Sequence, residues 1–249
     1  MSLKKFKIDK VIDKTDNFTT KHPLFDLPFR LLFIAKTGDS KSTNLLNYFV
    51  KEEGYKNHFE PEQIFIFSGS LDGDFKIKTM IEELEIPIQN TFDNYDNDIV
   101  NIIYDMLVER YNENIENGIK DPKKLNSVFI FDDLAYNNSF KSKGKDDAIR
   151  RIFFNGRKFL VSILIITQKL SGSLDTSIRE NASGIIFGKS SNKQLEILEK
   201  DANYLTGKNA KKRFYDMVRK ATDEPYSKFI VNYSKKHLYF NENMEELKY

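Results

Sequence analysis

The chain has 249 residues, of which 40% are hydrophobic and 31% charged, and this composition suits one large folded domain and argues against disorder. It contains no cysteine, which excludes disulfides and the usual zinc-finger ligand sets, and no apolar run approaches the roughly 18 residues that a membrane span needs. The net charge is only +2, so any contact with nucleic acid must come from local basic patches.

Residues 1–24 are polar and without periodicity, and we expect them to form an N-terminal arm. The short apolar run 30–35 predicts a strand, and apolar residues at helical spacing over 44–50 predict a helix after it. A second buried strand is expected at 63–67, closed by a turn. The stretch 76–89 is expected to begin as a helix and to lead into an extended segment.

The next segment, 96–117, predicts an amphipathic helix with its apolar side chains on one face. The residues expected on that face are Ile99, Ile102, Ile103, Met106, Leu107 and Tyr111. Gly118 stands where the C-cap of this helix is expected. A hydrophobic strand starts at Ser127 and ends in two carboxylates, and a polar, lysine-bearing loop follows at 138–147.

The remaining segments continue the alternation of strands and helices. They are a helix at about 146–157, the most apolar strand at 160–167, a short strand at 185–187, a helix at 191–202, a basic helix at 208–221 and a strand pair near the sequences FIVNY and HLYF. Several strands are apolar throughout, which predicts an α/β fold with a mostly parallel central sheet and helices on both faces. Without an internal repeat or a linker-like break, residues 25–249 are expected to form a single domain.

A candidate phosphate-binding loop lies between the first strand and the first helix. The standard pattern is G-x-x-x-x-G-K-[ST], in which backbone N–H groups surround the phosphates, the lysine reaches the β and γ phosphates, and the hydroxyl binds Mg²⁺. Here the candidate nucleotide-binding residues are Ala35, Lys36, Thr37, Gly38, Asp39, Ser40, Lys41, Ser42 and Thr43.

The loop departs from that pattern at three points. Ala35 and Ser40 replace the two glycines, and Asp39 places a negative charge beside the anion site. Ser40 matters most, because a side chain stands where the backbone must approach phosphate. Asp39 is expected to weaken binding unless it points to solvent. Taken alone, the segment fits an ordinary turn between a strand and a helix equally well.

The later strands carry the other chemistry that such a loop requires. Asp132 follows four apolar strand residues, and we expect it to hold Mg²⁺, while its neighbour Asp133 can orient or deprotonate the attacking water. Gln168 directly follows the strand at 160–167, where an amide can sense the γ-phosphate or position the water. The alternative is that the two acids only end a strand and cap the next turn.

In their order along the chain, these motifs resemble the FtsK–HerA superfamily. The matching segments are FRLLFIAKTGDSKST, SVFIFDDL, NGRKFLVSILIITQ and IRENASGIIFG, and the terminal PYSKFIVNY is similar to the last strand of the family. The resemblance spans roughly residues 27–233 and is greatest to the poxvirus-type genome-packaging ATPases of large DNA viruses and virophages.

The resemblance implies a RecA-like P-loop ATPase that assembles into a homo-oligomeric ring, a pentamer or hexamer, and drives double-stranded DNA into a preformed capsid. It implies ATP and Mg²⁺ as cofactors, Lys41 and Ser42 as Walker A residues, Asp132 as the magnesium residue and Asp133 in place of the usual catalytic glutamate. Capsid proteins are further implied partners, and the cytoplasm of an infected cell, at the viral factory or on the virion, is the implied location.

Two further sets of basic residues are candidates for motor functions. Arg179, and after it Arg157, is a candidate for the arginine that completes the active site of the neighbouring subunit, although either can equally form a structural ion pair. Lys141, Lys143 and Lys145 are the candidate DNA contacts at the pore, because phosphate contacts supply affinity without sequence preference. The basic helix at 208–221 is a second patch, for which a solvated face is the simpler interpretation.

Three other functions remain open on the sequence alone. The first is a structural or binding subunit whose degenerate loop hydrolyses ATP weakly or not at all. The second is a HerA-like helicase motor, which shares nearly every motif. Another P-loop enzyme, such as a nucleotide kinase or GTPase, is disfavoured because the chain lacks an N-K-x-D motif and an evident arginine-rich lid.

Overall fold

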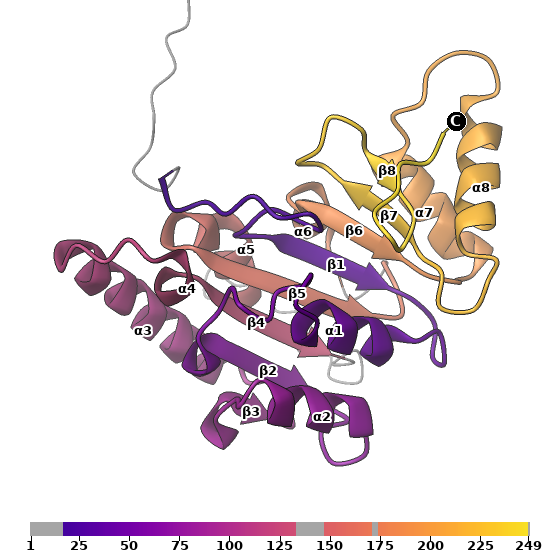
Figure 1. Cartoon of the computed structure of the whole chain (residues 1–249). Coiled ribbons are helices and arrows are strands. Elements are labelled where there is room, and N and C mark those ends of the chain that lie inside the picture. Colours follow the sequence, from indigo (N-terminus) through magenta and orange to yellow (C-terminus); the bar gives the residue numbers. More distant parts are fainter. Residues whose placement is uncertain (1–16, 133–146, 171–173, 249) are drawn as a thin grey trace, which may run out of the picture.

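A computed structural model describes residues 17–132, 147–170 and 174–248, and these form an eight-stranded sheet in the order β3-β2-β4-β5-β1-β6-β7-β8 (Figure 1). The strands are β1 (Arg30–Ile34), β2 (Ile64–Ser68), β3 (Thr91–Phe92), β4 (Ser127–Asp132), β5 (Val161–Thr167), β6 (Gly184–Phe187), β7 (Phe229–Asn232) and β8 (Tyr239–Phe240). From β3 to β6 all neighbouring strands pair in parallel, whereas the pairs β6–β7 and β7–β8 are antiparallel. The expected mostly parallel sheet is confirmed.

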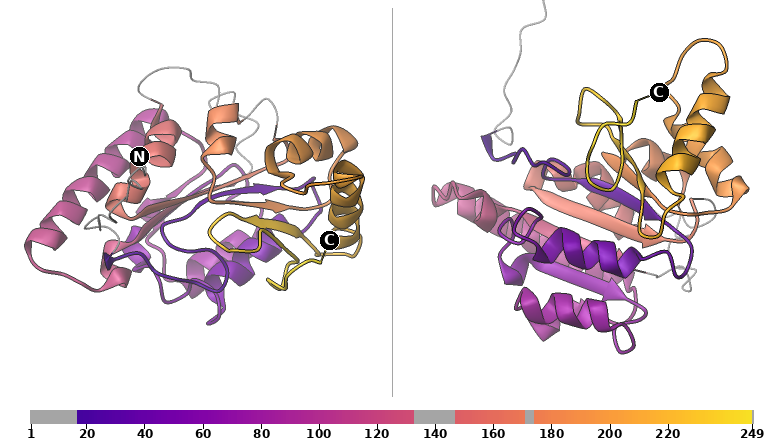
Figure 2. Two further views of the ribbon diagram at one scale, coloured as in Figure 1. Left: turned by 90° about the horizontal axis from the view of Figure 1, so that it is seen from above. Right: turned by 45° about the vertical axis from the view of Figure 1, so that its right-hand side comes forward.

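Helices cover both faces of this sheet (Figure 2). They are α1 (Lys41–Val50), α2 (Phe75–Glu83), α3 (Asn97–Glu116), α4 (Pro122–Leu125), α5 (Ala148–Asn155), α6 (Thr176–Glu180), α7 (Asn192–Ala202) and α8 (Ala210–Ala221), with the short 3-10 turns η2 (Pro61–Gln63), η3 (Ile88–Asn90) and η6 (Gly156–Phe159). Helices α1 and α2 bury side chains in the core of one face, whereas α3, α5, α6, α7 and α8 contribute to the core of the other.

The central strands are buried along their whole length because both of their faces are covered. Every residue of β2, β4 and β5 is buried, which agrees with their uninterrupted apolar sequences. Side chains of β4 alternate between the two cores, so that Phe129 and Phe131 pack on the α3 side and Val128 and Ile130 on the α1 side. The parallel arrangement brings the carboxyl ends of β1, β4 and β5 to one edge of the sheet.

Helix α3 differs from the expectation in the face that it buries. Val100, Ile103, Tyr104, Leu107 and Tyr111 are the buried residues of this helix. The predicted face was therefore wrong for three residues, since Ile99, Ile102 and Met106 are 38%, 60% and 61% exposed. The reason is that the buried stripe follows the i, i+3, i+4 spacing from Val100, which leaves the other apolar residues on a second, solvent-facing stripe.

The stretch 76–89 begins as the expected helix, α2, and then leaves the helical conformation before residue 85. The helix begins one residue earlier, at Phe75, because the Asp74 carboxylate accepts hydrogen bonds from the N–H groups of Lys76 and Ile77. It ends at Glu83, and Glu85 then adopts a left-handed conformation with φ 53°. The expected extended segment contains η3, so the chain turns before it reaches β3.

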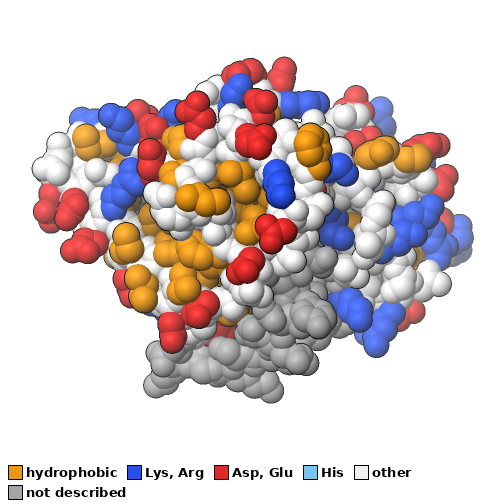
Figure 3. Space-filling view, turned by 90° about the horizontal axis from the view of Figure 1, so that it is seen from below, with side chains coloured by type: hydrophobic (Ala, Val, Ile, Leu, Met, Phe, Trp, Pro, Cys, Tyr) orange, Lys and Arg blue, Asp and Glu red, His pale blue; other side chains and the backbone are white. Residues whose placement is uncertain are grey.

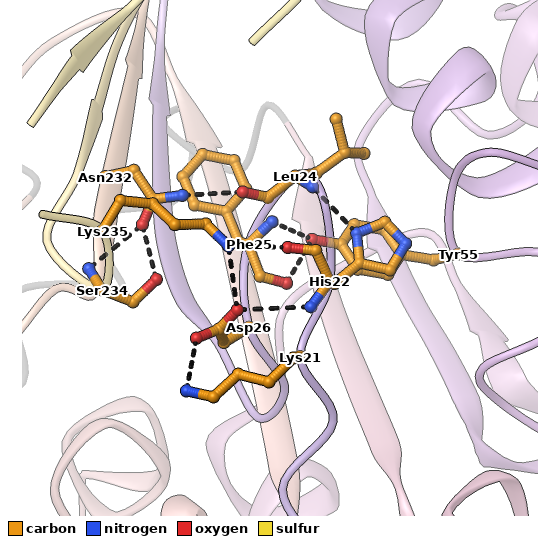
Figure 4. Close-up of polar contacts among 9 residues, drawn as sticks. All are labelled: Lys21, His22, Leu24, Phe25, Asp26, Tyr55, Asn232, Ser234 and Lys235. Carbon is orange, nitrogen blue, oxygen red and sulfur yellow. Dashed lines mark hydrogen bonds and ion pairs between the residues drawn. The ribbon is translucent and has the colours of Figure 1, made fainter. Parts of the chain in front are cut away.

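Part of the predicted N-terminal arm packs against the domain. Residues 17–24 are described, and His22 among them is only 4% exposed. Figure 4 shows this segment between the turn that contains Tyr55 and the end of β7: the Tyr55 hydroxyl donates to the Phe25 carbonyl (2.9 Å), and the Asn232 side chain donates to the Leu24 carbonyl (2.6 Å). Residues 1–16 of the arm lie outside the described residues.

As for membranes, the part of the chain that the structure describes contains no helix with the length and apolar character to cross one.

Candidate functional site

The candidate phosphate loop crosses the carboxyl ends of the neighbouring parallel strands β5, β1 and β6. The Ala35 N–H donates to the Thr167 carbonyl at the end of β5 (3.2 Å), and the Lys36 N–H donates to the Lys189 carbonyl just beyond β6 (3.3 Å). Helix α1 begins at Lys41, directly after the loop. Open parallel sheets bind ligands outside the carboxyl ends of their strands, and a helix N-terminus favours an anion there.

The Lys41 side chain folds back over this loop. Its ammonium donates to the carbonyl oxygens of Ala35 and Lys36, both at 3.2 Å. The loop therefore holds the charge beside the N-terminus of α1. An ammonium has three donors and no acceptor, so a phosphate group can take the place of either carbonyl as its partner.

The Ser42 hydroxyl points to a carboxylate that sequence reasoning missed. It donates to Asp74 Oδ2 at 2.6 Å, while the other oxygen of Asp74 accepts from the first turn of α2. Asp74 thus joins the start of α1 to the start of α2. The only sequence signal for it was an aspartate at an N-cap position, which marks a helix start rather than a site.

Asp132 ends β4 and is 2% exposed. Its Oδ2 accepts a hydrogen bond from the Ser68 hydroxyl at 3.2 Å, because the parallel register of β2 and β4 places these two residues side by side. Strand β5 lies between β4 and β1 in the sheet. The aspartate and the phosphate loop consequently approach one another across the end of β5.

These residues line one cavity of about 350 Å³ at the carboxyl edge of the sheet. Its lining consists of Thr37, Gly38, Ser40, Lys41, Ser42, Ser70, Asp74, Lys76, Asp132 and Tyr226. The loop, the end of β4 and the start of α2 therefore converge. Tyr226 was not identified from the sequence; it precedes β7, is 58% exposed and has a φ of 70°.

The donors around this cavity suit a magnesium ion that accompanies a nucleotide. Ser42 offers a hydroxyl, and Asp132 and Asp74 offer carboxylates, the hard oxygen ligands that Mg²⁺ prefers. Within the described ranges, no three His, Cys, Asp or Glu side chains gather around one point. Mg²⁺ commonly keeps several waters and takes substrate phosphates as ligands, so one or two protein oxygens are sufficient.

The first turn of α1 also contains polar atoms without partners. The hydroxyl of Thr43 and the amide nitrogen of Asn44 are buried and make no hydrogen bond. A buried polar group that lacks a partner is rare and calls for an explanation. Neither residue lines the cavity that contains Lys41 and Asp132, and Asn44 borders a separate one together with Leu24 and Tyr48.

Ser40 adopts a left-handed conformation, with φ 61° and ψ 25°, at the N-cap of α1. Glycine reaches this conformation without cost, whereas other residues lose roughly 1–2 kcal/mol. The replacement of the usual glycine therefore leaves the fold of the loop intact but strains it. Ser40 also lines the cavity, beside Lys41 and Ser42.

We predict that Ser40→Gly stabilises the protein by about 1 kcal/mol and raises ATP turnover, because it removes both the strain and the side chain. Thermal unfolding and steady-state turnover are the measurements. Asn209→Gly is the matched control, since Asn209 has the same φ of 61° but caps the distant helix α8. It should stabilise less, because asparagine tolerates the left-handed conformation better than serine, and should leave turnover unchanged. An equal gain in turnover from both variants would contradict the assignment.

Asp39 does not line the cavity and does not point to open solvent. Its Oδ2 accepts from the Lys189 N–H at 2.8 Å and forms an ion pair with Lys228 at 3.4 Å. The side chain is only 11% exposed. Its negative charge therefore has a positive partner, which the sequence did not reveal.

Gln168 directly follows the last residue of β5, Thr167, whose carbonyl bonds the first residue of the phosphate loop. It is half-buried and does not line the cavity in this conformation. Its role as a polar sensor stays a prediction.

The two arginine candidates lie away from the cavity. The Arg179 guanidinium donates to Asp201 (2.7 Å) and to the Leu174 carbonyl (3.0 Å), and its side chain is 13% exposed. To reach a neighbouring subunit it must leave these partners. Arg157 lies in η6 before β5, at the opposite edge of the sheet from the phosphate loop, and lines a cavity of about 580 Å³ together with Arg30. Burial and the charge of Arg157 lower the pKa of Arg30.

Four of the predicted site residues cannot be placed. Asp133 and the lysines at 141, 143 and 145 lie outside the described residues, in the segment between β4 and α5. Their roles stay predictions.

The fold and the cavity together define a P-loop NTPase, with the phosphate loop after β1 and the acidic strand end of β4 on either side of β5. The family model of the poxvirus A32 protein matches residues 16–243. The chain therefore belongs to the poxvirus A32 protein family, and the resemblance to poxvirus-type packaging ATPases is confirmed. None of the curated protein sequences matches the chain.

Solved structures share the fold at low sequence identity. The genome packaging NTPase B204 from Sulfolobus turreted icosahedral virus 2, in complex with ATP-gammaS, is 15% identical with a TM-score of 0.54, covering 86% of this chain and 94% of that one. The DNA-packaging ATPase B204 from Sulfolobus Turreted Icosahedral Virus is 17% identical with a TM-score of 0.51, covering 89% and 99%. ATPases 2 and 3 of EssC from Geobacillus thermodenitrificans are 11% identical with a TM-score of 0.54, covering 85% and 38%.

Proposed function

We propose that this protein is an ATP-hydrolysing motor that translocates double-stranded DNA and packages a viral genome into a preformed capsid. The observation that carries the proposal is the cavity in which Lys41, Ser42 and Asp132 meet at the carboxyl edge of the sheet. Family membership and the structural likeness to packaging NTPases support it.

In the proposed site, the triphosphate lies along the loop and α1. Lys41 exchanges its carbonyl partners for the β and γ phosphates. Ser42 and Asp132 would hold Mg²⁺, which neutralises charge on the phosphate oxygens when bound. Ser42 would release its hydrogen bond to Asp74 on binding.

Hydrolysis itself is assigned to groups around the γ-phosphate. Asp133 follows the magnesium residue directly and would orient or deprotonate the attacking water. Gln168, at the end of the intervening strand β5, would sense the γ-phosphate. An arginine from a neighbouring subunit, Arg179 or Arg157, would stabilise charge in the transition state.

The proposed DNA contacts are Lys141, Lys143 and Lys145. They belong to the segment that joins Asp132 to α5 in the sequence. We predict that reversing all three to Glu reduces DNA-stimulated turnover at least tenfold and leaves the basal rate unchanged, because each lysine would neutralise a DNA phosphate. Stimulation of turnover by duplex DNA, titrated at two salt concentrations, measures this. Full stimulation in the triple variant would contradict the pore assignment.

A homo-oligomeric ring, a pentamer or hexamer, is supported by the two unlike ends of the sheet. At the β3 end, α2, η3 and α3 expose large hydrophobic side chains, and Figure 3 shows hydrophobic side chains gathered on this lower face among acidic ones. These side chains are Phe75, Ile88, Ile99, Ile102 and Met106. At the other end, α8 is basic through Lys211, Lys212, Arg213, Arg219 and Lys220. Ends of unlike charge suit the head-to-tail contacts that close a ring.

We further propose capsid proteins as partners and the cytoplasm of an infected cell, at the viral factory or on the virion, as the place of action. Both follow from the proposed packaging role. A HerA-like helicase motor would use the same site and would differ in unwinding the duplex.

The second candidate is a structural or binding subunit with weak or no hydrolysis. The strained conformation of Ser40 favours it, because the loop must bind phosphate with a side chain in the way. ATP turnover of the full chain with Mg²⁺, with and without double-stranded DNA, separates the two. Turnover that DNA stimulates supports the motor, while absence of turnover in both the parent and Ser40→Gly supports the structural subunit.

A further inference from the structure

We infer that Lys228 is a positioning residue of the phosphate loop: its buried ammonium neutralises Asp39 and ties the loop to the C-terminal segment before β7. The inference rests on the proposed nucleotide site and adds to it a residue that is far from Lys41 in the sequence.

The contact is enclosed on both sides. The Lys228 side chain is 0% exposed and that of Asp39 11%, with 3.4 Å between Nζ and Oδ2. The ammonium also donates to the Ser227 carbonyl at 3.0 Å, and Asp39 Oδ2 accepts from the Lys189 N–H at 2.8 Å. Asp39 is thus held from β7 and from the turn after β6 at once.

Gly188 provides the space in which these groups meet. A Cβ atom at this position would stand 2.0 Å from Asp39 Oδ2, 2.8 Å from Ala35 Cβ and 3.1 Å from Lys228 Cε. Any side chain there would push Asp39 away or displace the backbone of the loop. Gly188 and Ala35 therefore fit one another. Ala35 and Asp39, two of the three departures from the P-loop pattern, thus belong to one arrangement.

The charges of Lys228 and Asp39 are expected to affect the binding of a phosphate ligand. Burial lowers the pKa of Lys228 most strongly, Asp39 and Glu242 act to raise it, and Lys41 lowers it further. Lys41 and Lys228 are thus close enough to repel, and Asp39 pairs with Lys228. Without Lys228, the charge of Asp39 would lose its ion-pair partner in a partly buried position of the phosphate loop, two residues before Lys41, and its repulsion would act on a phosphate ligand of that loop.

The test is a double-mutant cycle on ATP affinity, measured by titrating the full chain with a fluorescent ATP analogue. We expect Lys228→Met to weaken binding about tenfold and Asp39→Asn to leave it unchanged or tighter. The double variant should recover to within about threefold of Asp39→Asn, because no uncompensated charge then remains. A double variant as weak as Lys228→Met would overturn the inference, and so would unchanged affinity in Lys228→Met.

Hydrogen–deuterium exchange of residues 35–42 without nucleotide provides a readout that does not need ATP to bind. Lys228→Met should raise exchange in this segment. The matched control is Lys235→Met, which removes another lysine–aspartate pair of the C-terminal segment, with Asp26 at 3.3 Å, and should not change exchange there. Failure of the parent to bind ATP would contradict the proposed function, whereas unchanged exchange in Lys228→Met would contradict the positioning role.

Discussion

Lys41→Ala is expected to lower ATP turnover at least a hundredfold and to weaken nucleotide binding. Its ammonium lies over the phosphate loop, 3.2 Å from two loop carbonyl oxygens. Replacing it leaves the cavity with the carboxylates of Asp74 and Asp132 and the ammonium of Lys76, which belongs to α2 rather than to the loop. Removing one preorganised donor to developing charge costs roughly 10²–10³ in rate, and loss of a full charge costs no less.

Steady-state turnover with saturating Mg²⁺ and ATP measures this effect. Lys78→Ala is the control, because Lys78 is an exposed lysine of α2 that does not line the cavity. It should keep the parent rate and stability. A Lys41→Ala protein that is folded and turns over ATP at the parent rate would contradict the site assignment.

Asp132→Asn is the second change with a large expected effect, a loss of turnover of at least a hundredfold. The substitution keeps the size of the side chain and the acceptor for the Ser68 hydroxyl, so the end of β4 should keep its place. It removes the negative charge that would attract Mg²⁺ and hence the magnesium-dependent neutralisation of the phosphates.

The measurement is turnover as a function of Mg²⁺ concentration together with binding of an ATP analogue without metal. The variant should need much more Mg²⁺, while metal-free binding stays within about threefold of the parent because Lys41 is intact. Ser68→Ala separates charge from packing: it removes the hydrogen-bond donor but leaves the carboxylate, and should retain most of the activity. An unchanged Mg²⁺ dependence in Asp132→Asn would show that the metal is held elsewhere.

The positions of the phosphate loop and of Asp132 could be predicted from the sequence, because these residues directly follow the strands that position them. The apolar runs that became β1, β4 and β5 are unambiguous, and parallel pairing alone brings Lys41 and Asp132 to one edge. The position of β5 between β1 and β4 could not be predicted, because periodicity identifies a strand but not the strands that pair with it.

Other features could not be predicted because they depend on contacts between distant segments. In the sequence, nothing distinguishes Lys228 from the other lysines, and only the fold places it against Asp39. Likewise, the sequence identifies Asp74 only as a helix cap, and its hydrogen bond with Ser42 arises because α2 packs beside α1. The buried face of α3 was missed for a different reason: this helix has two apolar stripes, and periodicity cannot tell which one meets the sheet.

The central claim is that ATP hydrolysis at this site moves the protein along double-stranded DNA. Displacement of a fluorescent third strand from a DNA triplex tests it most directly, because only a motor that travels along the duplex removes that strand. Displacement is expected to require ATP and Mg²⁺, to disappear in Lys41→Ala and to fall in the lysine-to-glutamate triple variant. ATP turnover at the parent rate with no displacement, on duplex of any length, would contradict the claim.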